Sequence, residues 1–173
     1  MKKRTSIQIL PIIFVGLFLN ACSISYKFTG GSVDYNIYKS ISIGNFPNNA
    51  ELVNPTLSQT FSEALKDKYT RQTRLEVLSG EGGQMHIEGE IVGYQLTSMA
   101  ISADSYASET KLTLTINVRF SDYKNPEEDF EKRYSANQIF DSNQMLTDVE
   151  AELVDEMVKE ISDKIFNETV AKW

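Results

Sequence analysis

The chain has 173 residues, with 17 basic and 24 acidic side chains and a formal net charge of −7. This acidic balance argues against a nucleic-acid partner, because binding phosphates requires concentrated Lys and Arg. One cysteine cannot build a disulfide framework, so stability must come from an apolar core of about one domain's size.

The first 21 residues have the pattern of an export signal. The basic start MKKR precedes an apolar run over residues 7–19, which is shorter than the roughly 20 residues that span a bilayer but suits a secretory signal. The sequence LNAC then ends at Cys22 and resembles the bacterial lipobox, whose cysteine receives a diacylglycerol on sulfur and an N-acyl chain after cleavage. We therefore predict a signal peptide over residues 1–21 and a lipid anchor on Cys22; the alternative is a buried cysteine that follows a signal by chance.

The lipid anchor predicts a location for the protein. Several acyl chains hold a protein stably at a membrane, whereas one chain binds only marginally. Ser23, rather than an aspartate, follows the cysteine. By analogy with enteric bacteria, this favours passage to the outer membrane over retention at the inner one.

The chain after the anchor divides into a tether and a domain. Residues 22–37 are expected to form a lipidated tether with a short strand, and residues 38–173 a single domain. Ile41 and Ile43 alternate with serines, which predicts a strand. A helix should follow, with Asn54 as its N-cap and Pro55 at its first helical position. An apolar residue recurs at every fourth position: Leu57, Phe61, Leu65 and Tyr69.

Three further strands and a helix complete the domain. Alternation predicts strands at 85–96, with a bulge or bend at Gly93, at 111–120, and more weakly at 129–138. Thr147 and Glu150 have the spacing of a capping box before a long amphipathic helix. The predicted fold is thus α+β: a two-layer sandwich, with two amphipathic helices packed on one face of a roughly four-stranded mixed or antiparallel sheet.

The sequence offers little for catalysis. The only cysteine is assigned to lipid, and the only histidine, His86, lies beside Glu88 on a strand's polar side, where a solvated or hydrogen-bonded role is favoured over a metal site. No G-x-S-x-G accompanies it, and SGEGG lacks the Lys of a phosphate loop. We predict no enzyme, no catalytic residue, no metal and no cofactor beyond the covalent lipid.

The sheet face that the helices leave uncovered should be polar. It carries Glu88, Glu90, Lys111, Thr113, Thr115, Asn117 and Arg119, with Lys132 or Arg133 from the neighbouring strand. Two interpretations stay open: an ordinary wetted sheet surface, or a surface that fits into a polar, water-filled space.

Several collinear segments resemble the lipopolysaccharide-assembly lipoprotein family LptE, closest to its Bacteroidetes branch. They are ELVNPTLSQTFSEALKDKYTRQTRL, HIEGEIVGY, KLTLTINVRF, NPEEDFEKRYSANQIFDSNQ and the C-terminal VEAELVDEMVKEISDKIFNETVAKW. The resemblance implies two helices on a four-stranded sheet. It also implies an outer-membrane lipoprotein that faces the periplasm and plugs the lumen of the barrel LptD. Together such a pair inserts lipopolysaccharide into the outer leaflet.

This resemblance gives the polar face and the 97–110 connection a purpose. Barrel interiors are polar, and the connection, with Met99, Ile101 and Tyr106, is expected to contact the barrel. The candidate lipopolysaccharide contacts are four basic residues: Lys111, Arg119, Lys132 and Arg133. Two other functions stay open, a lipid-binding module and an adaptor lipoprotein of another outer-membrane assembly machine.

Overall fold

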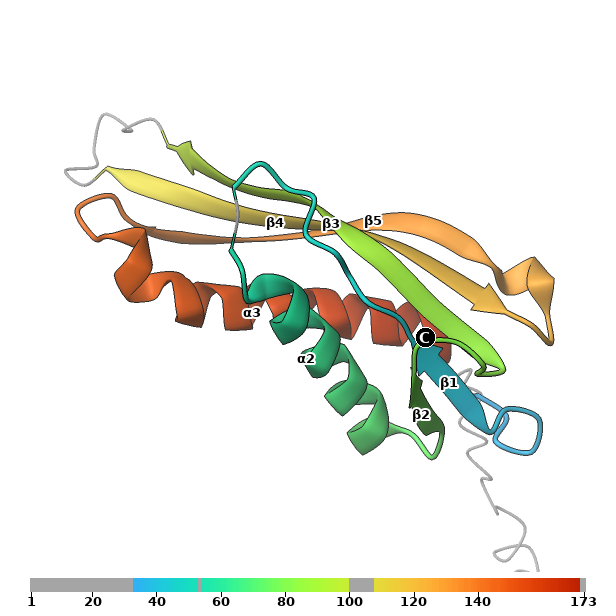
Figure 1. Ribbon diagram of the computed structural model, residues 1–173. Coiled ribbons are helices and arrows are strands. Elements are labelled where there is room, and N and C mark those ends of the chain that lie inside the picture. Colours follow the sequence, from blue (N-terminus) through green and yellow to red (C-terminus); the bar gives the residue numbers. More distant parts are fainter. Residues whose placement is uncertain (1–32, 53, 100–107, 172–173) are drawn as a thin grey trace, which may run out of the picture.

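Figure 1 shows the computed structural model, which describes residues 33–52, 54–99 and 108–171. Its elements, in chain order, are β1 (Ser40–Ile43), α2 (Leu57–Gln72), β2 (Glu76–Ser79), β3 (Met85–Ser98), β4 (Glu109–Asp122), β5 (Phe130–Asp141) and α3 (Leu146–Phe166). A short 3-10 helix, η2 (Pro126–Glu128), lies between β4 and β5, and a π-helical turn, η3 (Asn167–Ala171), extends α3. None of the helices in these ranges is long and apolar enough to cross a bilayer.

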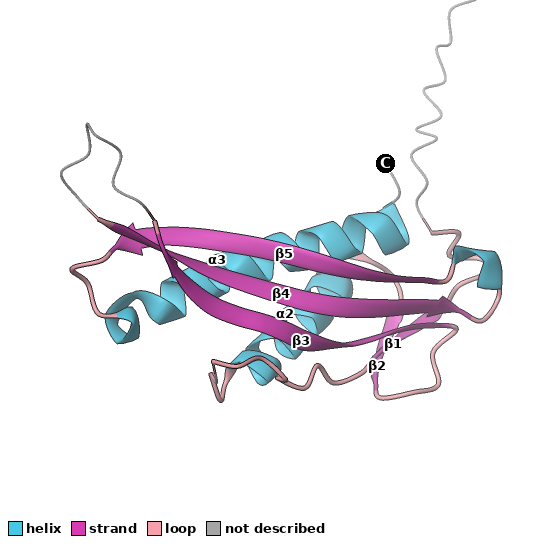
Figure 2. Cartoon of the chain, turned by 90° about the horizontal axis from the view of Figure 1, so that it is seen from above, coloured by secondary structure: helices cyan, strands magenta, loops and turns pink. Residues whose placement is uncertain are grey.

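The strands form one mixed sheet in the order β2-β1-β3-β4-β5. β1 runs parallel to both β2 and β3, while β3, β4 and β5 form an antiparallel meander. Both helices lie on the same side of this sheet, as the view from above shows by placing the strands in front of them (Figure 2). The predicted α+β class is confirmed, and the short strand β2 is a fifth strand beyond the four that alternation indicated.

Each helix buries the apolar stripe that its sequence predicted. In α2 the residues at four-residue spacing, Leu57 through Tyr69, are fully buried. The Asn54 amide oxygen accepts the backbone N–H groups of Thr56 and Leu57 at 3.0 and 3.1 Å, as a capping side chain does, although the helix itself begins at Leu57. The N-cap of α2 is Thr56, so the predicted N-cap at Asn54 is wrong by two residues and Pro55 lies before the helix, although the Asn54 amide still holds the first N–H groups.

Two irregularities in β3 fit the long strand to its neighbours. The register with β4 shifts between Ile91 and Gly93, which confirms the predicted bulge. Gly89 faces the helices, and a Cβ there would lie 2.8 Å from the Phe46 ring. The missing side chain lets Phe46 pack edge-on against Phe61, with ring centroids 4.8 Å apart, in the centre of the core.

The glycine-rich segment between β2 and β3 is a crossover. Because β2 and β3 flank β1, residues 80–84 must pass over β1, and they do so on the side away from the helices. A Cβ on Gly83 would lie 2.4 Å from the Ser42 amide nitrogen, so only glycine fits there. The segment covers Ser42 and His86, which are 0% and 7% exposed although both point away from the helical layer.

Candidate functional site

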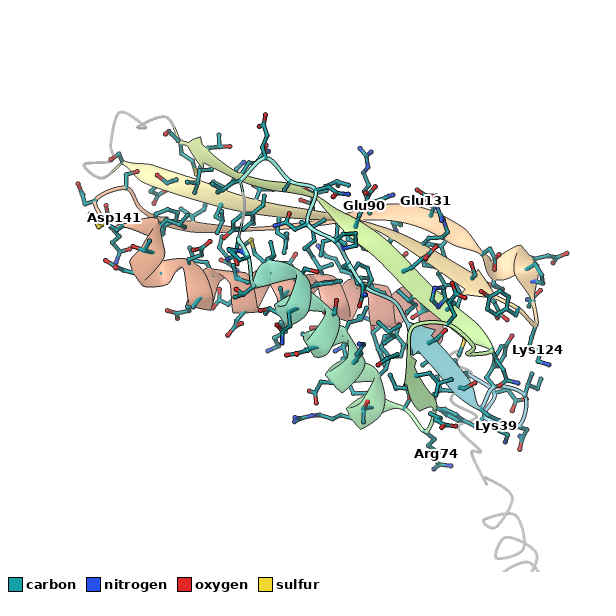
Figure 3. All side chains as sticks on the ribbon, in the orientation of Figure 1. Lys39, Arg74, Glu90, Lys124, Glu131 and Asp141 are labelled. Carbon is teal, nitrogen blue, oxygen red and sulfur yellow. The ribbon has the colours of Figure 1, made fainter. Side chains whose placement is uncertain are left out.

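The candidate site is the open face of the sheet, defined as the outward side chains of β3, β4 and β5. The strand register sets Glu88, Arg119 and Glu131 in one row, and Glu90, Asn117 and Arg133 in the next. Glu90 and Glu131 project from this face, away from both helices, as Figure 3 shows. The predicted polar face therefore exists, and none of the described helices covers it.

One row of the open face is an ion network centred on Arg119. The guanidinium donates to Glu88 at 3.0 Å and to Glu131 at 3.3 Å, while Asn117 donates to Glu131 at 2.8 Å. Hydrogen bonds from Asn117 and Arg119 lower the pKa of Glu131, and the bond to Glu131, followed by the bond to Glu88, raises the pKa of Arg119. Two carboxylates thus balance the charge of Arg119, which is poorly placed to bind a phosphate.

A shallow hollow of about 310 Å³ lies over this network. Pro47, Gly89 and Asn117 contribute to its walls, and its charged groups are three carboxylates and one guanidinium: Glu88, Glu90, Glu131 and Arg119. Excess negative charge disfavours anions. The hollow is therefore suited to a polar or cationic side chain of a partner, not to lipid phosphate.

The four candidate lipopolysaccharide contacts do not form one group. Lys111, Arg119 and Arg133 lie on the open face, but Lys132 occupies the opposite side of β5 and pairs with Glu168 of η3. Among the described residues neither Lys111 nor Arg133 forms an ion pair, although Arg133 helps lower the pKa of Glu131. The rows of Lys111 and Arg133 are six residues of β4 apart, which is about 20 Å at strand spacing. The two cations therefore cannot bind the same anionic group of a ligand.

The middle of the open face is uncharged. Thr115 of β4 and Ser135 of β5 are Cα partners whose hydroxyls lie 3.1 Å apart. Gln95, Thr113 and Asn137 form the next row towards the distal end, the end that carries the β3–β4 connection. Hydroxyl and amide groups can exchange water for partner hydrogen bonds at little net cost, which suits a face that meets another polar surface.

The predicted capping box is wrong. Met145, not Thr147, is the N-cap of α3, and it makes no side-chain capping bond. The Glu150 carboxylate instead accepts from the Tyr94 hydroxyl at 2.6 Å and from the Asn54 amide at 3.0 Å. It therefore joins α3 to β3 and to the start of α2, because tertiary partners offered stronger bonds than the helix's own backbone.

His86 has a structural environment. Its Nδ1 lies 2.7 Å from Ser42 Oγ, and its Nε2 lies 3.6 Å from a Glu88 oxygen. Although Ser, His and Glu thus lie in line, Ser42 is fully buried under the β2–β3 crossover, so a substrate cannot reach its hydroxyl. In the described part of the chain, no three His, Cys, Asp or Glu side chains gather as a metal site.

The remaining predicted site residues belong to the two ends of the molecule. Met99 closes the distal end: its N–H donates to Glu109 at 2.9 Å, and its side chain is exposed, like those of Leu96, Ile139 and Met145. Ile101, Tyr106 and Cys22 lie outside the described residues. At the other end, the Val33 N–H donates to the Val170 carbonyl at 3.2 Å, so residue 33 lies beside the end of α3.

One contributor to the open face was missed in the sequence. Glu131 balances Arg119, but alternation alone gave no reason to choose it among the many acidic side chains. The sequence did indicate that Lys132 points towards the helices: it lies two residues from both Phe130 and Tyr134, which face the helices, and therefore on the same side of β5.

The chain is thus a helix-backed mixed sheet with one polar face left open by the described helices. A family model described as LptE, Lipopolysaccharide-assembly, matches residues 38–169. The chain belongs to this family, whose members are non-enzymatic lipoproteins of lipopolysaccharide assembly. No curated protein matches the chain in sequence.

Solved structures share the architecture. A neuraminyllactose-binding hemagglutinin homolog from Helicobacter pylori is 10% identical, with 85% of this chain and 90% of that chain covered and a TM-score of 0.56. The PelC dodecamer from Paraburkholderia phytofirmans is 9% identical, with 83% and 96% covered and a TM-score of 0.51. At such identities the likeness concerns the fold alone.

Proposed function

We propose that this LptE-family protein is an outer-membrane lipoprotein, anchored through acyl chains on Cys22, that binds and plugs an LptD-type barrel during lipopolysaccharide insertion. Family membership over residues 38–169 supports the role in lipopolysaccharide assembly. The lipobox-like LNAC supports the anchor. The 97–110 connection, which begins beside the exposed Met99, is the segment proposed to enter the lumen.

The open face is the proposed contact with the barrel, and its character carries this proposal. Barrel lumens are polar and hydrated, and a docking surface there needs hydroxyls, amides and balanced charges rather than an apolar patch. The open face has these groups: the Arg119 network at one end and the Thr115–Ser135 row in the middle. The core between helices and sheet is filled by buried side chains, which counts against a lipid-binding pocket in that layer.

Affinity purification from native outer membranes tests the partner. A large barrel of the LptD family should be recovered at near one-to-one ratio with the tagged lipoprotein. Recovery of a different assembly machine would favour the adaptor function, and recovery of lipid alone would favour a lipid-binding module; either result would reject the proposed partner.

Photo-crosslinking from single positions tests the surface. A crosslinking amino acid at Thr113 or Thr115, both on the open face, should capture the barrel. The matched control is Glu156, an exposed position on α3 on the other side of the molecule. Capture from Glu156 but not from the strands would mean that the helices, not the sheet, meet the barrel.

Direct lipopolysaccharide contact is a separate part of the proposal. Because carboxylates already pair with Arg119 and Lys132, we assign it to Lys111 and Arg133. Replacing both with Gln should weaken lipopolysaccharide binding by about tenfold or more, since a hydrogen bond to a charged group contributes about 1.5–3 kcal/mol before solvent screening. The control K66Q/K124Q makes the same change in net charge away from the open face. Equal binding by the two double variants would show that these cations do not contact the lipid.

A further inference from the structure

A second surface lies on the helical side of the molecule, where a groove separates α2 and α3. It encloses about 340 Å³, and Ala64 of α2 and Val158 of α3 contribute apolar groups to it. Lys68, Asp155 and Lys159 are among the charged residues along it, and Lys68 forms an ion pair with Asp163 across the two helices. This groove is separate from the open face of the sheet, which lies on the other side of the molecule.

A buried hydroxyl in the groove lacks a partner. Ser162 also lines it, is 2% exposed, and its Oγ has no hydrogen-bond partner among the described residues. Such a group costs free energy unless something binds it. Ser162 Oγ lies below the floor of the groove, so the groove offers a docked segment its apolar side chains and its charged rim rather than this hydroxyl.

The chain itself supplies a segment at the right place. Val33 is held beside Val170 by a backbone hydrogen bond of 3.2 Å, and the Tyr35 ring lies 5.9 Å from the Arg74 guanidinium, just past the end of α2. The described chain therefore starts where both helices end. Residues 23–32 precede this point, with Ile24, Tyr26 and Phe28 alternating with small or charged residues.

We propose that residues 23–32, the tether that follows Cys22, dock as an extended segment in the α2–α3 groove. Lys159 lies 11 residues before Val170, about 16 Å along a helix. Phe28 lies five residues before Val33, also about 16 Å along an extended chain. The aromatic side chains of the tether thus reach the apolar part of the groove.

Docking would fix where the lipid anchor leaves the domain. A tether that runs back along α3 carries Cys22 to the helical side, so that the open face stays turned away from the anchor and free for the barrel. This docking goes beyond the proposed function and rests on it only in taking lipidated Cys22 as the first residue of the mature chain.

Disulfide trapping in the full-length protein tests the docking. The pair F28C/K159C joins the tether to the groove, and F28C/E160C is the matched control. Residues 159 and 160 are adjacent and both exposed, but Glu160 lies on the other flank of α3, where it pairs with Lys164. We expect the Lys159 pair to form at least about tenfold faster than the control, because docking raises its effective concentration.

Peptide mass spectrometry of the unreduced protein identifies the linked residues, so the result does not depend on whether Cys22 carries lipid or a barrel is bound. Equal rates for the two pairs, or no link in either, would overturn the proposal.

Discussion

Glu150 is the side chain whose role changed most between sequence and structure, and replacing it tests the structural account. Its carboxylate accepts the Tyr94 hydroxyl and the Asn54 amide, which come from β3 and from the start of α2. The Glu150→Ala variant removes the acceptor from both donors. Burial, followed by the bond to Glu150, raises the pKa of Tyr94, so that its hydroxyl stays protonated and must donate at any ordinary pH.

The expected loss follows from these two bonds. A buried donor left without an acceptor costs about 1–3 kcal/mol. Asn54 is half-exposed and can turn to water, so most of the cost comes from Tyr94, which is 1% exposed. We expect Glu150→Ala to reduce the free energy of unfolding by about 2–3 kcal/mol, measured by urea unfolding followed with circular dichroism. The matching fall in Tm is about 5–10 °C for a domain of this size.

Two further variants make the prediction specific. Glu152→Ala removes the same charge from an exposed position two residues along α3 and should change stability by no more than about 0.5 kcal/mol. A double-mutant cycle between Glu150→Ala and Tyr94→Phe should show a coupling energy of about 1–2 kcal/mol. Coupling close to zero, or equal losses of stability in the Glu150 and Glu152 variants, would refute the tertiary role of Glu150 and favour a capping role at the start of α3.

Two other perturbations follow from the core and from η3. Gly89→Ala places a Cβ 2.2 Å from the Asn117 carbonyl and 2.8 Å from the Phe46 ring, so thermal unfolding should show a loss of stability of about 1–3 kcal/mol. Gly93→Ala is the milder control, because the nearest contact of its Cβ is a side-chain atom at 3.2 Å. Equal losses of stability in the two variants would contradict the packing argument. Burial raises the pKa of Glu168, but hydrogen bonds from a lysine and a tyrosine of β5 outweigh burial and lower the pKa overall. The ionised Glu168 therefore stabilises the fold above the unfolded-state pKa of about 4.3. This stabilisation is lost as the pH falls through the lower folded-state pKa. The urea midpoint of Glu168→Gln should therefore fall less between pH 6 and pH 3 than that of the wild type, and parallel pH profiles would exclude the effect.

Local patterns in the sequence determined much of the architecture. Four-residue spacing in α2 and alternation in β3 and β4 fixed which side chains are buried, because water drives one face of each element inwards whatever its partner is. The break of phase at Gly93 located the bulge for the same reason. The polar character of the open face followed from the residues that alternate with these buried ones in the strands.

The partners of individual polar groups were decided by the tertiary structure. β2 has only four residues and two half-buried apolar side chains, so it becomes a strand through its pairing with β1 rather than through its own pattern. Glu150 looked like a helix cap because a capping box is local, but a phenol and an amide from distant segments compete for the same oxygen. Arg119 looked like a free cation until the register set Glu88 and Glu131 beside it.

The sequence by itself thus determined the layers, the polar face and the lipobox-like start, which depend on periodicity and on a contiguous motif. Only the tertiary structure decided which charges on that face are balanced, and that the described chain begins beside the end of α3. Those properties depend on distances between residues far apart in the chain, and strand register and helix packing set such distances only after folding.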